Sequence, residues 1–190
     1  MKDEAFINEL LQKGSKAKEK VIIEFSGMSL NQLNWQASST SWSIAQCLDH
    51  LIRSHSIYFT NLQKISRGEY KMNFWSKYSP FTKLCGRLLK ERMQEKERKK
   101  MKAPGKIQPS SNFDPGIIEQ YHKNLDTFLQ FILNCNNIDI DKTILTSPTI
   151  PIVTYSLRDA FYFLLTHEHR HINQAVNVKT NKEFPKSITF

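Results

Sequence analysis

Apolar residues recur at steps of three and four through four long stretches of this 190-residue chain. The stretches cover roughly residues 4–26, 41–67, 114–134 and 156–178. Because a period near 3.6 residues gathers apolar side chains on one face of a helix, each stretch predicts an amphipathic α-helix. The alternation of apolar and polar residues that is typical of strands is almost missing. The pattern therefore predicts an all-α protein built as a four-helix bundle.

Polar residues at the edges of the stretches indicate where the helices begin. Thr40 or Ser41 can cap the second helix, because a hydroxyl oxygen accepts from the free N–H groups of a first turn. Asp114 can cap the third helix, with Pro115 in its first turn. The last helix is expected to begin at Ser156, after an extended segment that contains two prolines.

Residues 69–113 break the helical pattern between the second and third bundle helices. This insert contains three of the chain's prolines, four clustered aromatic residues (Phe74, Trp75, Tyr78 and Phe81) and a very basic stretch over 82–100 that predicts an additional helix. An inserted segment of this length is unusual between bundle helices. A lid over a pocket, a homodimer contact and simple packing at the edge of the bundle would each explain it. We expect residues 1–190 to form a single domain that includes the insert.

Composition places the chain among ordinary globular proteins, with 39% hydrophobic and 24% charged residues. At this length a single domain can bury a core without disulfides. The sequence has no apolar run of membrane-spanning length, and its N-terminus carries acidic residues where a secretory signal carries basic ones. We therefore expect a cytoplasmic protein without a membrane partner. Its three cysteines show no Cys-x-x-Cys spacing, so they are expected to be reduced thiols.

The chain carries 27 Lys and Arg against 18 Asp and Glu, for a net charge of +9. Much of the excess lies in one run from Lys83 to Lys106. No nucleic-acid motif and no interleaved aromatic residues accompany the run, so a solvated basic helix is favoured over nucleic-acid binding. A non-catalytic, stress-related binding module that presents this basic insert to an acidic partner is retained as an alternative function.

Three of the six histidines lie close together in residues 166–178. On a helix, His167 and His171 are one turn apart on the same face, whereas His169 points roughly the other way. Two imidazoles at this spacing can reach one metal ion, but a further ligand has to come from elsewhere in the fold.

The further ligand is predicted to be His50, at one edge of the second helix's apolar stripe. His55 competes with it but lies deeper in the stripe, which is typical of a hydrogen-bonded core histidine. His122 lies beside the third helix's stripe without a histidine one turn away, so a packed or exposed role is favoured. A bundle whose histidines are only core and surface residues is the remaining interpretation.

Three residues next to these histidines bear on the chemistry. Cys47 lies one helical turn before His50 and could line the same pocket, although inert packing is favoured. Asp49 and Glu168 are the acids nearest the candidate ligands, but each lies about 100° round its helix from the neighbouring histidine. Both are therefore expected to form surface ion pairs rather than to act as a general base.

Two motifs together carry a family resemblance. The segment Trp42-Ser-Ile-Ala-Gln-Cys-Leu-Asp-His50-Leu and the segment His167-Glu-His-Arg-His171-Ile-Asn-Gln174 resemble the DinB-like superfamily of four-helix proteins (DinB/YfiT type). The similarity extends over nearly the whole chain in the order and spacing of elements. It implies a four-helix bundle with a divalent-metal site formed, by position, by His50, His167 and His171. It also implies a role for Gln174 beside the metal or facing the substrate.

Three neutral imidazoles that hold Zn²⁺ or Ni²⁺ leave a coordination position open, as in catalytic sites. The ion can activate water for hydrolysis or a low-molecular-weight thiol for S-transfer. The resembled group includes thiol-dependent transferases. Because no clear general base is visible, we favour thiol-dependent S-transferase-like chemistry on a small-molecule electrophile over metal-dependent hydrolysis.

Overall fold

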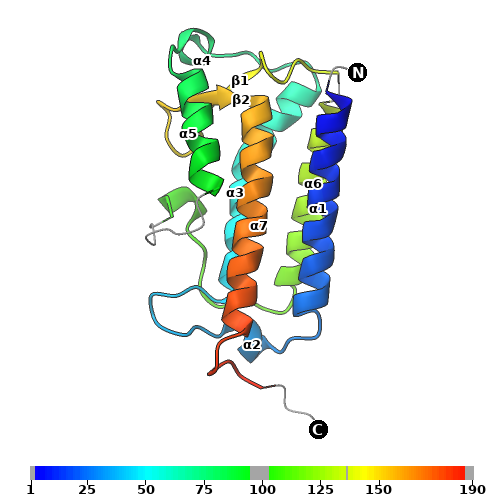
Figure 1. Cartoon of the computed structure of the whole chain (residues 1–190), viewed down its shortest axis with the longest axis vertical. Helices are drawn as coiled ribbons and strands as arrows, with labels where there is room; N and C mark the ends of the chain where they lie inside the picture. Colours follow the sequence, from blue (N-terminus) through cyan, green and yellow to red (C-terminus); the bar gives the residue numbers. More distant parts are fainter. Residues whose placement is uncertain (1–2, 95–102, 136, 187–190) are drawn as a thin grey trace.

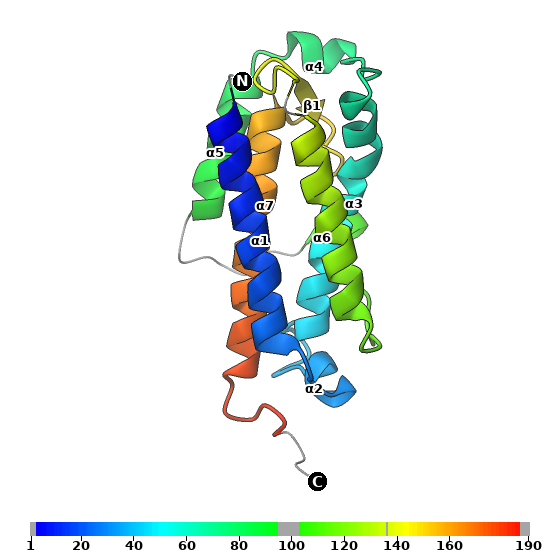
Figure 2. The same cartoon turned by 90° about the vertical axis from the view of Figure 1, so that its right-hand side faces the viewer.

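The structure of the chain is a computed structural model that describes residues 3–94, 103–135 and 137–186. Four long helices run side by side along the molecule (Figures 1 and 2). They are α1 (Glu4–Phe25), α3 (Ile44–Ser66), α6 (Ile117–Asn134) and α7 (Leu157–Lys179). This arrangement confirms the all-α bundle that the apolar period predicts.

The four helices bury their apolar stripes against one another. Helix α3 packs against α6 and α7, and α1 packs against the same two helices from the other side. Phe25, Leu48, Leu125 and Phe161 are fully buried, one from each helix. Burying a large apolar side chain stabilises the fold by about 1.5–3 kcal/mol, so this seam holds the helices in register.

Helix α3 begins later than the sequence suggested, at Ile44 with Ser43 as its N-cap. The Ser43 hydroxyl accepts from Gln46 N at 3.1 Å, and Gln46 Oε1 accepts in return from Ser43 N at 3.0 Å. The expected cap at Thr40 or Ser41 is therefore wrong, because the reciprocal Ser-x-x-Gln pair satisfies two free N–H groups at once.

Two further details of the expected helix ends need correction. Helix α6 has Gly116 as its N-cap, and Asp114 accepts from Gly116 N at 2.7 Å in the turn before the helix. The Asp114 cap is therefore wrong. The connection after α1 contains a short helix, α2 (Leu30–Asn34), capped by Ser29 through a second capping box.

In its described residues, the insert between α3 and α6 contains three short elements: α4 (Phe74–Tyr78), α5 (Thr82–Gln94) and η1 (Gly105–Ile107). Helix α5 lies beside the first half of α7 (Figure 1). The two helices approach closely at Gly86, where a Cβ atom would collide with the Asp159 carboxylate. The rest of the predicted basic helix, residues 95–100, lies outside the described residues.

A small antiparallel hairpin leads into α7. Strand β1 (Ile144–Thr146) pairs with β2 (Thr154–Ser156), with Leu145 opposite Tyr155. Ser156 then caps α7 by accepting from Asp159 N at 3.1 Å, so the helix begins at Leu157, one residue after the expected start. In the part of the chain that the structure describes, no helix combines the length and apolar character needed to cross a membrane.

Candidate metal centre

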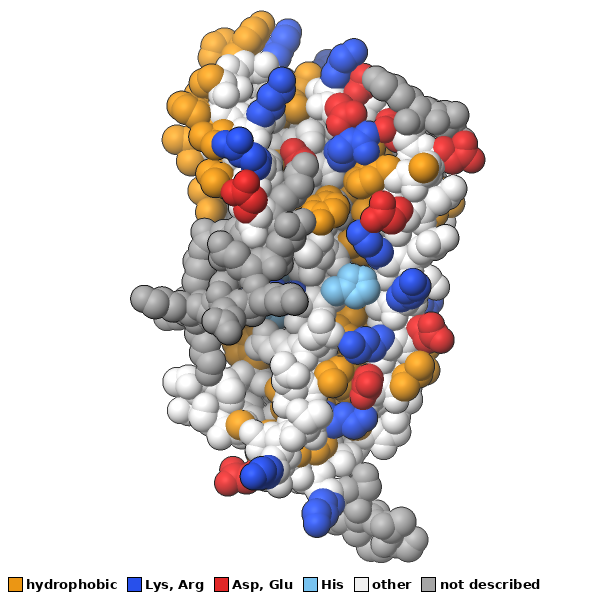
Figure 3. Space-filling model, in the orientation of Figure 1, with side chains coloured by type: hydrophobic (Ala, Val, Ile, Leu, Met, Phe, Trp, Pro, Cys, Tyr) orange, Lys and Arg blue, Asp and Glu red, His pale blue; other side chains and the backbone are white. Residues whose placement is uncertain are grey.

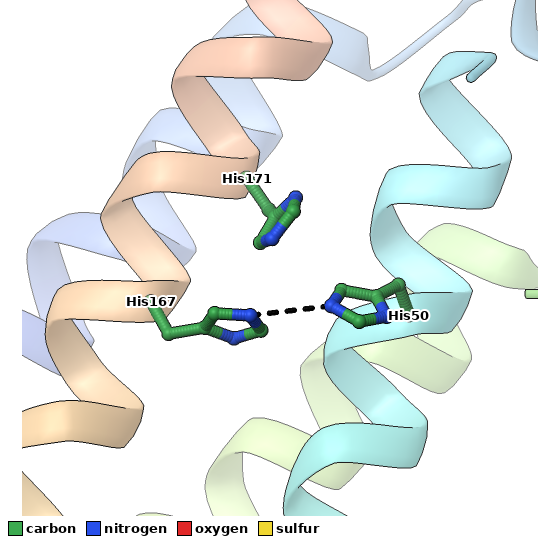
Figure 4. Close-up of side chains that lie close together, drawn as sticks. All are labelled: His50, His167 and His171. Atoms are coloured by element: carbon green, nitrogen blue, oxygen red, sulfur yellow. Dashed lines mark hydrogen bonds between the residues drawn. The ribbon is translucent and has the colours of Figure 1, made fainter. Parts of the chain in front are cut away.

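The side chains of His50, His167 and His171 meet in the space between α3 and α7 (Figure 4). One ring nitrogen from each lies within 4.8 Å of the other two. The three side chains, named here the histidine cluster, are 2%, 8% and 9% exposed. The structure therefore brings together the three histidines that the sequence singles out as candidate metal ligands.

The local folding of two helices sets this geometry. His167 and His171 are one turn apart, so they project in the same direction from α7 toward α3. His50 lies on α3 beside the fully buried side chains of Leu48 and Leu51, which pack that helix into the core. The apolar seam between α3 and α7 thus fixes the distance across which the imidazoles face each other.

The tautomer of His50 is fixed by a backbone carbonyl. His50 Nδ1 lies 2.7 Å from the oxygen of Ile107, and because a carbonyl only accepts, the proton is on Nδ1. Nε2 therefore carries a lone pair, and it lies 3.2 Å from His167 Nε2. A backbone carbonyl that orients an imidazole in this way is typical of histidines that bind metals.

The carbonyl itself is held by a segment at the end of the insert, residues 105–110, which we name the strap. Ser110 ties the strap to α3 in three ways. Its backbone N–H donates to Asp49 Oδ2 at 2.9 Å, its hydroxyl accepts from Arg53 at 2.6 Å, and its carbonyl accepts from Gln46 at 3.2 Å. These bonds keep the Ile107 oxygen in place above His50.

Burial keeps all three imidazoles neutral. It lowers the pKa of His50 and of His171 from the ordinary 6.5, to about 3 in His171, and it lowers the pKa of His167 well below that value. Mutual repulsion within the cluster adds to the lowering at His167 and His171. A side-chain contact with Gln174 partly opposes it at His171. The rings therefore offer lone pairs rather than positive charge near neutral pH.

This donor set fits a divalent metal ion. Neutral imidazole suits zinc and nickel, and zinc binds imidazole nitrogen at about 2.0–2.1 Å. Two nitrogens 3.2 Å apart are both within reach of one such ion. The histidine cluster can therefore hold a metal ion.

Aromatic rings and one amide surround the cluster. Trp42 lies against His50 with ring centroids 4.8 Å apart and stacks on His171 at 5.6 Å. Gln174 contacts His171, next to the predicted ligands. Cys47 is fully buried in the hydrophobic core, and burial raises the pKa of its thiol to about 12. Such a thiol stays protonated near neutral pH.

Glu168 does not form the surface pair that the sequence suggested. Its carboxylate is fully buried, accepts from the Tyr121 hydroxyl and lies 3.0 Å from Nε2 of His55. The two atoms are close without forming a hydrogen bond. We name Glu168, Tyr121 and His55 the acid cluster. A buried tyrosine and a buried histidine in facing apolar stripes were the sequence signal for it, since both need polar partners.

The protons of the acid cluster follow from its surroundings. The Asn124 amide donates to Ser56 at 2.9 Å, which turns its oxygen toward Nδ1 of His55 at 3.3 Å. Nδ1 of His55 is then the donor to the Asn124 oxygen. His55 is thus a core histidine, as the sequence analysis allowed.

Asp49, His122 and His169 are the remaining polar residues for which the sequence made a prediction. Asp49 does pair with Arg53, at 2.7 Å, but the same carboxylate also holds the strap and is largely buried. His122 lies half-buried against the Tyr121 ring on α6, outside the histidine cluster. His169 is also half-buried and outside the cluster.

Fold and site together define a helical-bundle protein with a buried histidine group able to bind a metal ion. A sequence model of the DinB superfamily matches residues 16–175, which is most of the chain. The chain therefore belongs to the DinB superfamily, as its two motifs predicted. Neither a curated protein nor a solved structure matches it significantly.

Proposed function

We propose that this protein is a divalent-metal-dependent enzyme that transfers a low-molecular-weight thiol to a small electrophilic substrate. His50, His167 and His171 would hold the ion, with zinc or nickel favoured by the three neutral imidazoles. The superfamily assignment and the convergence of the three rings support the metal site. The surroundings of the cluster favour thiol transfer over hydrolysis.

The observation that carries the choice is the engagement of both nearby carboxylates elsewhere. Glu168 faces Tyr121 and His55, away from the histidine cluster. Asp49 binds Arg53 and the strap. Neither acid is free to take a proton from an attacking water, a step that would normally help a hydrolase.

His50, His167 and His171 would hold a divalent ion that would lower the pKa of a bound thiol enough to remove its proton without a protein base. The chain's own residues do the rest. The Ile107 carbonyl fixes the lone pair of His50 toward the other two rings, and Trp42 covers one side of the cluster with an apolar surface. In the transfer, the thiol proton passes to solvent, sulfur bonds to the electrophilic carbon, and the leaving group departs with its electron pair.

Cobalt-loaded protein tests the proposal in two stages. Titration with a small thiol should produce the sulfur-to-cobalt charge-transfer absorption, and His171→Ala, which loses a ligand, should not retain the metal. The loaded wild type should then consume an aryl halide only when the thiol is present. Thiol-independent cleavage of an activated ester would show that the protein acts as a hydrolase and not as a thiol transferase. A wild type that retains neither zinc, nickel nor cobalt would overturn the metal site itself.

A further inference from the structure

Exposed apolar side chains are concentrated on one part of the surface. Eight of the twelve large hydrophobic side chains that are exposed in the described residues come from residues 72–88 and 150–152. Figure 3 shows them gathered over α4 and α5, at the upper left of the view. Six of them form what we name the insert patch: Phe74, Tyr78, Phe81, Leu84, Leu88 and Ile152.

The insert patch is anchored to the bundle. Trp75 donates to the carbonyl of Ile152 at 2.8 Å, which ties α4 to the hairpin loop. Thr82 and Thr154 share a hydrogen bond of 2.8 Å, which ties α5 to β2. With Gly86 seated against α7, one face of α5 packs on the bundle while the patch faces outward. The patch is a preformed outer surface and does not cover the histidine cluster.

Its size is that of an interface. Phe74 is 79% exposed and Ile152 is 70% exposed. Since a buried aromatic side chain accounts for about 150–250 Å², six side chains exposed by 42–79% present several hundred Å². The largest apolar patch on a typical monomer is about 300–600 Å², and a stable interface buries about 800 Å² per partner. Together with a rim of polar residues, the insert patch is large enough to form such an interface.

The pattern along α5 fits a second helix of the same kind. Phe81, Leu84 and Leu88 follow the three- and four-residue steps that form a helix–helix seam. Arg87 and Glu91 border the seam, 3.9 Å apart and largely exposed, so both are available to new partners. Helix α5 is basic overall, with Lys83, Arg87, Lys90 and Arg92 against Glu91. Across a two-fold axis, Glu91 of each copy can meet Arg87 of the other. A purely anionic partner would meet Glu91.

We propose that the insert patch is the interface of a homodimer, in which the α5 helices of two copies pack against each other. The proposal is independent of the metal chemistry. It gives the insert a role at the edge of the bundle that leaves the histidine cluster within each copy intact. Of the sequence-based roles for the insert, it selects the homodimer contact.

Sedimentation velocity across a dilution series tests the interface. The wild type should have twice the 22.2 kDa chain mass and dissociate on dilution. Leu88→Glu and Phe81→Glu place a charge in the seam and should each weaken dimerisation by roughly tenfold or more, the equivalent of about 1.4 kcal/mol. Ile23→Glu is the matched control, because Ile23 is 70% exposed on α1, outside the patch. It should leave the dimer unchanged.

Helical circular dichroism and bound metal should remain at the wild-type level in all three variants, which separates loss of the interface from misfolding. A wild type that is monomeric at every concentration would overturn the proposal. So would a dimer that survives both seam variants. Monomeric protein that binds anionic vesicles through the patch would assign the surface to a membrane instead.

Discussion

His167 and Glu168 are neighbours on α7, yet their side chains enter two buried clusters of opposite character. In the histidine cluster, rings that burial keeps neutral bring one nitrogen each close to a common point. In the acid cluster, one carboxylate meets a hydroxyl donor and an imidazole at ion-pair distance. The histidine cluster therefore gathers potential metal-binding nitrogens, whereas the acid cluster brings a carboxylate together with a hydroxyl donor.

The two clusters show how a helical bundle can bury both kinds of polar group without losing its fold. A buried polar group costs free energy unless it is paired, and the acid cluster pairs its members across α3, α6 and α7. The histidine cluster avoids the cost of buried charge by staying neutral, which also makes it suitable for a metal. We therefore expect changes in the acid cluster to reduce stability and changes around the histidine cluster to reduce metal affinity.

The largest expected effect comes from Glu168→Ala. It removes the acceptor of the buried Tyr121 hydroxyl and the carboxylate that lies 3.0 Å from His55 Nε2. Leaving a buried donor without its partner typically costs about 1–3 kcal/mol. Urea unfolding of metal-free protein should show a loss of stability in this range, with little change in the unfolding m-value.

Glu24→Ala is the matched control for that experiment. Glu24 also pairs with a basic side chain, Lys179 at 3.0 Å, but the pair is partly exposed. Pairs near the surface contribute about 0–1 kcal/mol. If both variants lost the same small amount of stability, the acid cluster would not be the structural tie described above.

The pH dependence of the free energy of unfolding also distinguishes the histidine cluster from the acid cluster. Because burial lowers the pKa of each ring in the histidine cluster, the unfolded chain binds more protons than the folded chain below pH 6.5. The stability of metal-free protein should therefore fall as pH decreases from 6.5 toward about 3, the folded pKa of His171. The slope is up to about 1.4 kcal/mol per pH unit for each histidine.

His171→Phe keeps a ring in the same place and removes one titrating group. Its stability, measured by urea unfolding in a chelator, should decrease less steeply between pH 6.5 and pH 5 than that of the wild type. An unchanged slope would show that His171 binds its proton as readily when folded as when unfolded, contrary to its burial.

Sequence reasoning reached one cluster and missed the other for a physical reason. The spacing of His167 and His171 is local, so the helix period alone predicts their common face. His50 was chosen over His55 from its place at the edge of the second helix's apolar stripe, and the family resemblance implied the same residue. Glu168 was assigned to the surface on the assumption that α7 buries one face. In the structure α7 contacts α1, α3 and α5, so its buried surface is much wider.

The contacts of the strap could not be predicted either, because they join residues that are far apart in the sequence. Its bonds to α3 join residues 57–64 positions apart, and the key acceptor is the backbone oxygen of Ile107, which no side-chain pattern reveals. The fold class and the spacing on α7 depend on local periodicity, whereas the tautomer of His50 depends on the packing of the whole insert.

Asp49→Ala tests the strap and has the next largest expected effect. Without the carboxylate, the Ser110 N–H loses its acceptor and the Ile107 carbonyl is held less firmly over His50. Loss of such an orienting partner typically weakens metal binding by about 10–100-fold. Competition with a chromophoric chelator measures the affinity. Ser110→Ala removes only the hydroxyl contact with Arg53, so its metal affinity should stay close to that of the wild type. Equal metal affinities in the wild type and both variants would contradict the role of the strap.

Gln174→Ala should have the smallest effect and decides between two roles for this side chain. Gln174 is half-buried and contacts His171. A single neutral hydrogen bond contributes about 0.5–1.5 kcal/mol, a factor of roughly two to ten in affinity. If Gln174 orients His171, the variant should bind zinc more weakly by that factor, with an unchanged thiol titration of the cobalt-loaded protein. If Gln174 faces the substrate, only the thiol titration or the consumption of electrophile should change.

Asn173→Ala is the control, because the neighbouring Asn173 is exposed and accepts from Lys20 at 2.8 Å. A metal-affinity loss in this control equal to that of Gln174→Ala would assign the effect to the helix as a whole.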